Sequence, residues 1–439
     1  MRSDYVETLI VGSDYISTIT GLLCFEKKSS VALLNEHNFY QDPAFLSHLN
    51  SFDFHYLNVL GEKHNIQTLR NLKNYIINSP FTFHTNDKSI VLGRDFSSNI
   101  HECLRKIPEI FNSEQLRQID LITLSQQHEK YLGELARKLH QLSDISKFRE
   151  AVLIDDYHHF KNLKSIIQWD DSVDNLLRCL AGAYDNYIPK KMGVLHKLSL
   201  IFNLFSPFYL LDNDRLNNDL IREFEEKGGQ VLSDKIEGFT TQGKKLEGVK
   251  LEQTGRTFHF EELVGIGHPR DDLQLKVDCQ AQAYMSVNFV FDKIMCFPKT
   301  LGRFDYVVKQ RWLGSSIQSL SIQQFSDRVI ASFSISPELQ SKLQSSFIDY
   351  LQKELENFIR ELGYKGKYTT APYIYNDFDW RFREMSPRSM KKALSDNSTI
   401  NYIWWGDQKQ GFSNSRYIGQ FSMNPLGKTS LFHKAEKII

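Results

Sequence analysis

The chain begins with two apolar runs that enclose a helical pattern. Residues 6–11 are β-prone and apolar, and the run ends at Gly12. Beyond this glycine, apolar side chains recur every three or four positions as far as Phe25, which is typical of an amphipathic helix. A second apolar run occupies 31–34. Strand, turn, helix and strand within about 30 residues predict a βαβ unit, in which 6–11 and 31–34 are neighbouring parallel strands.

The centre of the chain has a helical pattern. From about residue 99 to residue 184, glycines are few and apolar residues fall three or four positions apart. Residues 215–227 repeat this pattern and end at Gly228 and Gly229, as expected for glycines at a helix C-terminus. A further helix is predicted over 337–362, because Ser336 before Pro337 is a helix-start signal.

Two groups of short strands are predicted in the second half. The first group follows the helix at 215–227, is separated by glycine-containing turns, and comprises 230–232, 235–241, 246–251, 257–260 and 263–266. The second group comprises 283–291, 304–311 and 328–335. We expect these three strands to form one sheet, with the helix at 337–362 packed on it.

Composition narrows the class of protein. The 439 residues include 53 Lys+Arg and 53 Asp+Glu, so the formal net charge is zero. A nucleic-acid partner is not predicted, because nucleic-acid-binding proteins usually have an excess of basic residues. Five scattered cysteines indicate a reducing compartment, and neither they nor the pair His158-His159 have metal-ligand spacing, so no metal is predicted. The N-terminal residues lack a signal-peptide pattern, which makes a cytoplasmic location the expectation. The most apolar stretch, 198–211, is shorter than the roughly 20 residues of a membrane-spanning helix. It is interpreted either as a buried element or as a segment that contacts a membrane surface.

Three segments carry a family resemblance. The first strand is followed by a degenerate fingerprint with Gly12, Asp14 and Ser17, and then by Gly21. The paired glycines after the helix at 215–227 lead into a strand, a hairpin and a returning strand. Near the C-terminus, Gly406-Asp407 follows the aromatic run 402–405. In this order, the segments resemble the flavin-dependent amine oxidase and phytoene desaturase superfamily, whose fold also includes the Rab GDP-dissociation inhibitors and Rab escort proteins.

The resemblance implies an α/β fold with two domains. A discontinuous Rossmann-like FAD/NAD(P)-binding domain would comprise 1–45, 195–270 and 395–439. A second α+β domain, with a mixed sheet and a helical insert, would comprise 46–194 and 271–394. Residues 402–405 would then end close to the Gly12 turn, because ligands in open α/β sheets lie beyond the carboxyl ends of the strands.

The resemblance also implies FAD as the cofactor and assigns its contacts. The phosphate turn would be Gly12-Ser13-Asp14 with Ser17, and the backbone at Ile236 would meet the adenine. The acid of the second strand is matched by Asn35, with Glu36 one place late. Gly406 and Asp407 would meet the phosphate–ribityl arm, although Asp beside Gly is also a common turn. Catalytic residues are not predicted.

Asp14 disfavours FAD. The second glycine of an intact fingerprint lets the backbone approach the pyrophosphate, and a carboxylate about 4 Å from a phosphate would repel each charge by roughly 4 kcal/mol at an effective dielectric near 20. Alternatively, Asp14 is a helix N-cap whose side chain accepts the free backbone N–H groups. Either interpretation weakens dinucleotide binding.

Three functions therefore remain open. The leading hypothesis is a flavoprotein fold that has lost its cofactor and binds a protein partner or an apolar ligand. The second is an active FAD-dependent oxidoreductase acting on an amine or a polyene. The third is a prenyl or lipid carrier similar to the GDP-dissociation inhibitors, motivated by the stretch 198–211. Aromatic side chains that either line a pocket or fill a core are Tyr373, Tyr375, Phe378, Trp380, Tyr402, Trp404 and Trp405.

Overall fold

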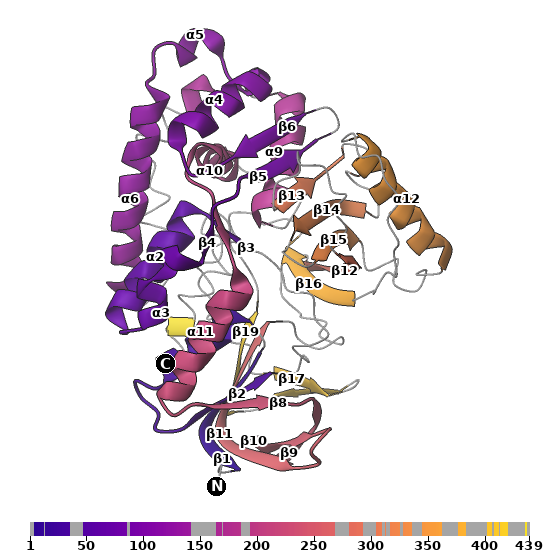
Figure 1. The fold of residues 1–439 in the computed structure, drawn as a ribbon. Coiled ribbons are helices and arrows are strands. Elements are labelled where there is room, and N and C mark those ends of the chain that lie inside the picture. The colour runs from indigo at the N-terminus through magenta and orange to yellow at the C-terminus, as the bar shows by residue number, and fades with distance from the viewer. Residues whose placement is uncertain are drawn as a thin grey trace.

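Two large mixed sheets organise the chain, with helices beside both (Figure 1). The structure is a computed structural model. It describes residues 4–12, 14–35, 47–85, 88–141, 164–168, 170–185, 194–267, 281–292, 304–309, 312, 317–324, 328–335, 345–361, 376–382, 402–405, 408–411, 413–419 and 435–436.

The first sheet has a Rossmann-like core. Its parallel strands lie in the order β8 (Gln230–Ser233), β2 (Val31–Asn35), β1 (Tyr5–Val11), β11 (Thr257–Gly267) and β19 (Ser415–Gly419). By position along the chain this is third, second, first, fourth and fifth, so the order reverses between β1 and β11. The predicted parallel pairing of the first two apolar runs is confirmed, with Thr8 opposite Val31 and Val11 opposite Leu34.

An antiparallel hairpin extends the first sheet. Strands β9 (Ile236–Gln242) and β10 (Lys245–Leu251) pair with each other, and β10 pairs with the first half of β11. The turn between them uses Gly243 at φ +60°, a conformation that favours glycine. Both strands lie within a residue or so of their predicted positions.

One predicted division in this sheet is wrong. The sequence indicated separate strands at 257–260 and 263–266, but β11 continues through Glu261 and Glu262. These two charged side chains stay at the surface, where Glu261 accepts a hydrogen bond from the Tyr5 hydroxyl and Glu262 pairs with Lys28 at 3.7 Å. Partners outside the ladder allow the strand to continue without burying a charge.

Helix α1 (Tyr15–Cys24) is buried along its whole length. It packs on α11 (Asn213–Glu226), where the Thr18 hydroxyl donates to Asn217 at 2.8 Å. A Cβ on Gly21 would lie 2.8 Å from the ring of Phe224, so the two helices approach through this glycine. The crossover between β1 and β2 is thereby fixed against the rest of the first sheet.

The second sheet contains the three strands that were predicted and four that were not. The order is β16 (Asn376–Phe382), β12 (Ala281–Asp292), β15 (Arg328–Ile335), β14 (Ile317–Gln324), β13 (Phe304–Val307), β5 (Phe81–His84) and β6 (Ser89–Leu92). Strands β14, β16, β5 and β6 were missed. Strand β13 pairs with β5 in parallel, so one sheet contains strands from both segments of the predicted second domain, 46–194 and 271–394.

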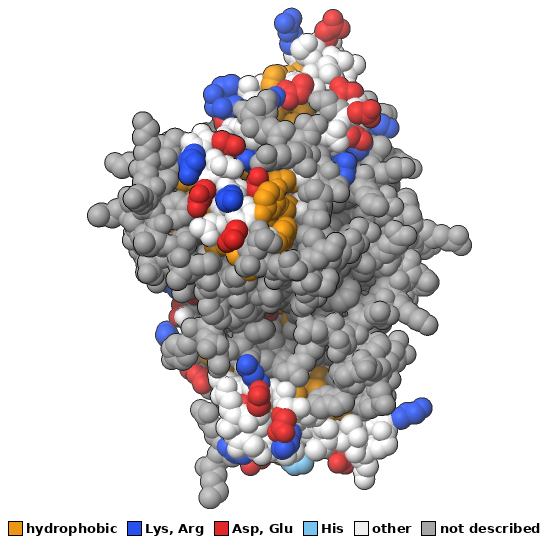
Figure 2. All heavy atoms as spheres, turned by 90° about the vertical axis from the view of Figure 1, so that its right-hand side faces the viewer, with side chains coloured by type: hydrophobic (Ala, Val, Ile, Leu, Met, Phe, Trp, Pro, Cys, Tyr) orange, Lys and Arg blue, Asp and Glu red, His pale blue; other side chains and the backbone are white. Residues whose placement is uncertain are grey.

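Helix α12 (Ser345–Glu361) packs on the second sheet, as predicted, through Leu351, Leu355 and Phe358. The predicted start of this helix at 336–344 lies outside the described residues. Figure 2 shows the face that carries α12, where hydrophobic side chains lie beside charged ones. On α12, Tyr350 is 46% exposed and its ring stacks on that of Phe347.

The remaining helices form a layer to one side of the second sheet and above the first (Figure 1). They are α2 (Ser51–Lys63), α3 (Gln67–Arg70), α4 (Phe96–Lys106), α5 (Ser113–Leu116), α6 (Leu121–Gln141), α9 (Asp171–Asp185) and α10 (Val194–Phe205), with 3₁₀ turns at Leu72–Tyr75 and Pro108–Ile110. A small sheet joins β3 (Ser47–Leu49), β7 (Tyr209–Leu211) and β4 (Ile76–Ile77). A separate pair is formed by β17 (Tyr402–Trp405) and β18 (Gln408–Gly411).

The most apolar stretch of the sequence lies in the interior. It forms α10 and β7, and its described apolar side chains belong mainly to the buried core beneath β5 and β6. Of its two interpretations, the structure therefore supports the buried element. No helix in the described part of the chain is both long and apolar enough to cross a membrane.

Candidate functional site

The candidate site lies where the strand order of the first sheet reverses. Strand β1 ends at Val11 and β11 passes beside it, with Val11 opposite Gly265. A Cβ on Gly12 would lie 3.1 Å from the carbonyl oxygen of Ile266. Open α/β sheets bind ligands beyond the carboxyl ends of their strands at such a reversal. We call Gly12 to Ser17 the β1–α1 turn.

Asp14 is the N-cap of α1. Its backbone is extended, with φ −102° and ψ 172°, and its Oδ1 accepts a hydrogen bond from the backbone N–H of Ser17 at 2.9 Å. The Ser17 hydroxyl donates to the same oxygen at 2.8 Å. The first N–H groups of a helix have no partner within the helix and carry about half a positive charge. A carboxylate of the chain itself thus occupies the anion-binding end of α1.

Gly12 is required by the turn itself. A Cβ at this position would lie 2.1 Å from the Ser17 Oγ and 3.0 Å from its Cβ. In an intact fingerprint, the first glycine allows the tight turn and the third lets the helix pack closely on the strand. Here the buried Ser17 side chain fills the space beside Gly12. The space that glycine leaves open is therefore taken by the protein's own side chain, and less room remains for a ligand.

The residues of the turn do not fit a dinucleotide pyrophosphate. The phosphate-binding end of a helix works through free N–H groups and a favourable dipole. Asp14 takes the Ser17 N–H and supplies a negative charge in the same place. At the end of β2, Asn35 stands where a carboxylate would be expected to receive the ribose hydroxyls, and it is 2% exposed.

Ile236 belongs to the core of the first sheet. Its side chain is buried in the apolar cluster that includes Val6, Leu34 and Leu251. Ile236 begins β9, the last strand on one side of the first sheet. A backbone contact to a ligand is compatible with this place, because a strand at the edge of a sheet has unpaired backbone groups. The predicted adenine contact stays a prediction.

A polar anchor next to this strand was missed at the level of sequence. The buried carboxylate of Asp234 accepts hydrogen bonds from the N–H groups of Lys235, Gln253 and Thr254 and from the Thr254 hydroxyl. Burial acts to raise the pKa of Asp234, but these hydrogen bonds bring the pKa below its ordinary value. Asp234 thus ties the start of β9 to the turn after β10. An Asp directly after a strand was the only signal for it.

Several predicted contacts lie outside the described residues. These are Ser13, Glu36, Gly406 and Asp407, with Tyr373, Tyr375 and the pair His158-His159. Strands β16 and β17 contain the other aromatic residues of the predicted pocket, but only their backbone pairing is described. The expected closeness of β17 to the β1–α1 turn stays a prediction. Within the described ranges, no three His, Cys, Asp or Glu side chains form a group that could hold a metal ion.

Comparisons with known proteins give fold neighbours at very low identity. No protein-family model matches the sequence, and no curated protein matches it. The flavin-dependent halogenase CmlS has a TM-score of 0.46 at 9% identity, over 99% of this chain and 56% of that one. The myxobacterial chondrochloren halogenase CndH, a variant of the FAD-dependent halogenases, has a TM-score of 0.45 at 11% identity, over 99% and 72%.

A third neighbour is the peptidyl tryptophan dihydroxylase QhpG, with a TM-score of 0.45 at 9% identity over 86% of this chain. The match spans 57% of the QhpG chain. These similarities are too weak to indicate an activity for this chain. The Rossmann-like strand order and the cap of α1 by Asp14 are observed in this chain itself and do not rest on these neighbours.

Proposed function

We propose that this chain is a flavoprotein-fold protein of the amine oxidase and phytoene desaturase superfamily that has given up tight FAD binding. In this proposal it acts by binding another molecule, either a protein partner or an apolar ligand. The observation that carries the proposal is the pair of hydrogen bonds by which Asp14 caps α1 at the place where a pyrophosphate would bind.

The energetic argument is a competition between two anions for one helix end. A pyrophosphate reaches the α1 N–H groups only after Asp14 has left them, which breaks two hydrogen bonds worth about 1 kcal/mol each. A displaced carboxylate that stays nearby adds a repulsion of roughly 4 kcal/mol. Because each 1.4 kcal/mol is a factor of ten, the sum of about 6 kcal/mol corresponds to a roughly 10⁴-fold loss of affinity.

The scaffold supports a retained binding role. The first sheet keeps the strand order of a dinucleotide-binding domain, and Gly12 and Gly21 keep their close contacts. The second sheet is an equally large structure with its own core. The carrier version of the proposal no longer draws support from the stretch 198–211, because this stretch is interior.

The alternative function is an active FAD-dependent oxidoreductase acting on an amine or a polyene. One observation favours it, namely that Gly12 lies at the reversal of strand order, where such domains hold their cofactor. The flavin would then be held mainly by groups other than the β1–α1 turn. The two functions differ in whether FAD stays with the purified protein.

The first experiment is the visible absorption spectrum of the full-length protein after expression with excess riboflavin and gel filtration. We expect no flavin absorption. A stoichiometric yellow chromophore that survives gel filtration would overturn the proposal and favour the oxidoreductase.

The second experiment tests the turn itself by titrating FAD into variants and following quenching of its fluorescence. We expect Asp14→Gly combined with Ser17→Gly to bind FAD at least about 100-fold more tightly than the wild type, because the charge repulsion and the competing cap are both removed. Asp14→Asn is the matched control, since it keeps the cap and removes only the charge, and it should gain less. Equal affinity of all three proteins would show that Asp14 does not control the site.

The binding role has its own readout. Native mass spectrometry of the protein purified from its own cells should show an apolar adduct or a stoichiometric protein partner. Fully folded protein that carries neither an apolar adduct nor a protein partner would contradict the binding role.

A further inference from the structure

Three polar side chains line up across strands β6, β5 and β13 of the second sheet. His84 Nδ1 lies 2.8 Å from the Ser89 Oγ, and His84 Nε2 lies 2.9 Å from Asp305 Oδ1. The side chain of Asp305 is fully buried and that of His84 is 5% exposed, whereas Ser89 is partly exposed. None of these residues belongs to the β1–α1 turn.

The strand pairing explains why these side chains meet. The N–H of Thr85 donates to the carbonyl of Lys88 at 2.8 Å, which makes these two residues a hydrogen-bonded pair. The next pair, His84 and Ser89, is therefore of the non-hydrogen-bonded kind, in which side chains lie closest. On the other side of β5, Asp305 is two places before Val307, the residue opposite His84, so it lies on the same face of the sheet.

The partners of His84 suit one tautomer of its neutral ring. With the proton on Nε2, the ring donates to the Asp305 carboxylate, which only accepts hydrogen bonds. Nδ1 then has a lone pair that accepts a hydrogen bond from the Ser89 hydroxyl. This is the order of donors and acceptors in a serine–histidine–aspartate relay, in which the imidazole is oriented by the acid and polarises the serine hydroxyl. The two ring nitrogens are exchanged here, because Ser89 lies on Nδ1 and Asp305 on Nε2.

The surroundings of Ser89 leave its outer side accessible. Strand β6 ends the second sheet among the described strands. The N–H of Val91 points away from β5, toward Glu102 Oε1 at 3.4 Å, and the N–H of Ser89 points the same way because alternate residues share a direction. The Val91 side chain lies on the same face as Ser89 and is 43% exposed.

The imidazole, in contrast, is sheltered. The ring of Phe358 from α12 lies edge-on to the His84 ring, with 5.3 Å between the ring centroids. A partly exposed serine within hydrogen-bond reach of a base, which is itself oriented by a third group, is the arrangement of an activated nucleophile.

We propose that Ser89 is a nucleophile for acyl transfer from esters with a small apolar acyl group. The Ser89 oxygen attacks the ester carbonyl carbon, and its proton moves to His84 Nδ1. The bond to the alkoxide breaks, and the alkoxide leaves with that proton as an alcohol. Water then attacks the acyl-serine with His84 again taking a proton, which releases the carboxylic acid and restores the Ser89 hydroxyl. Asp305 is a positioning residue, the Ser89 N–H faces the developing oxyanion, and Val91 contacts the acyl group.

The direct test is covalent labelling of the full-length protein with a fluorophosphonate, followed by mass spectrometry of the intact protein and of its peptides. We expect one label, located on Ser89, and at least about a 100-fold slower reaction for Ser89→Ala, because the activated nucleophile is removed. Ser98→Ala is the matched control, since Ser98 is an exposed serine of the neighbouring α4 that is paired with Asp95. Labelling that is absent, or that persists in Ser89→Ala, overturns the proposal.

A second measurement keeps the proposal testable if hydrolysis is slow. In Ser89→Cys, an imidazole at hydrogen-bond distance should shift thiolate formation below the ordinary thiol pKa of about 8.5. We therefore expect alkylation by iodoacetamide at about pH 7 to be at least roughly tenfold faster than in Ser89→Cys combined with His84→Gln. Equal rates and equal pH profiles would show that His84 does not activate residue 89 and that the three side chains only stabilise the sheet.

Discussion

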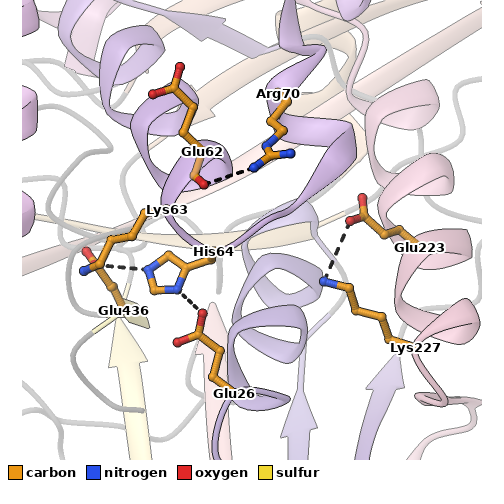
Figure 3. A network of polar contacts seen from close by, with 8 residues as sticks. All are labelled: Glu26, Glu62, Lys63, His64, Arg70, Glu223, Lys227 and Glu436. Carbon is orange, nitrogen blue, oxygen red and sulfur yellow. Dashed lines mark hydrogen bonds and ion pairs between the residues drawn. The ribbon is translucent and has the colours of Figure 1, made fainter.

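The buried carboxylate of Glu436 accepts a hydrogen bond from the buried hydroxyl of Tyr56 at 2.8 Å, although 380 residues separate the two. The same carboxylate contacts Lys63 Nζ at 2.5 Å and His64 Nε2 at 3.2 Å, and the other His64 nitrogen contacts Glu26 (Figure 3). Because Ala435 is also buried, residues 435–436 are anchored on α2. Burial, followed by the nearby Glu436, raises the pKa of Tyr56 well above its ordinary value.

Glu436→Ala should destabilise the protein by about 2–4 kcal/mol, because the buried Tyr56 hydroxyl loses its acceptor and His64 Nε2 loses its carboxylate partner. The measurement is the free energy of unfolding in urea, followed by tryptophan fluorescence. Lys63→Ala is the control from the same cluster. The Lys63 side chain is 44% exposed, so its loss should cost less than about 1 kcal/mol. Equal losses for the two variants would contradict the buried acceptor role of Glu436.

Stability should depend on the titration of His64. Burial alone would lower the pKa of His64, but hydrogen bonds to Glu436 and Glu26 raise it above its ordinary value. A raised pKa in the folded state stabilises the fold below the unfolded-state pKa of about 6.5, and this contribution is lost as the pH rises through the folded-state pKa. The stability difference between the wild type and His64→Gln should therefore be largest at about pH 6 and shrink toward alkaline pH.

The control for this pH dependence is His259→Gln. His259 is exposed, and its ring contacts the carbonyl oxygen of Glu247. Its substitution removes one exposed contact and should shift the urea midpoint only slightly. A flat difference for His64→Gln would show that His64 keeps the same protonation in both states.

Two helical glycines should respond to alanine in opposite ways. In Gly21→Ala, the new Cβ would lie 2.8 Å from the buried ring of Phe224, so we expect a loss of about 1–3 kcal/mol from overpacking. In Gly133→Ala, the nearest atoms belong to His55 at 3.7 Å, so the higher helix propensity of alanine should raise stability by up to about 1 kcal/mol. Thermal unfolding of both variants tests the pair, and a stabilised Gly21→Ala would show that α1 and α11 are less closely packed than described.

Asp14 should contribute to stability independently of any ligand. Asp14→Ala removes an N-cap side chain and should cost about 1 kcal/mol, whereas Asp14→Asn retains capping ability and should be nearly neutral. Chemical denaturation of the three proteins without FAD measures both effects. If Asp14→Ala is as stable as the wild type, the cap is not maintained in solution.

Local patterns predicted most strands of the first sheet, but they missed β19 and divided β11 in two. The runs at 6–11 and 31–34 were predicted correctly because parallel strands buried on both faces are continuous apolar runs. Strands β5 and β6 were missed because each has only four residues, and polar side chains such as His84 and Ser89 interrupt their apolar character. The parallel partner of β5 is β13, about 220 positions later in the chain, and no local window contains that information. Strand β6 pairs with β5.

The candidate site was predictable in its residues but not in its geometry. The sequence identified Asp14 and Ser17 as departures from a glycine fingerprint and left the cap as one of two interpretations of Asp14. Which one applies depends on the backbone at residue 14, and the structure places it in the extended conformation of an N-cap. The relay of Ser89, His84 and Asp305 was not predicted. It depends on which residues pair in the β5–β6 hairpin and on the register of β13, a parallel strand that is distant in sequence.

The late position of β19 in the chain has a consequence for synthesis on the ribosome. Strand β11 is translated by residue 267, but its second half obtains its outer neighbour only when residues 415–419 have emerged. During the intervening elongation, at about 5–20 residues per second, roughly 150 residues are added while this apolar strand lacks a partner on one side. An unpaired strand edge is a template for intermolecular pairing, so the nascent chain has an extended interval in which chaperone binding at β11 would compete with aggregation.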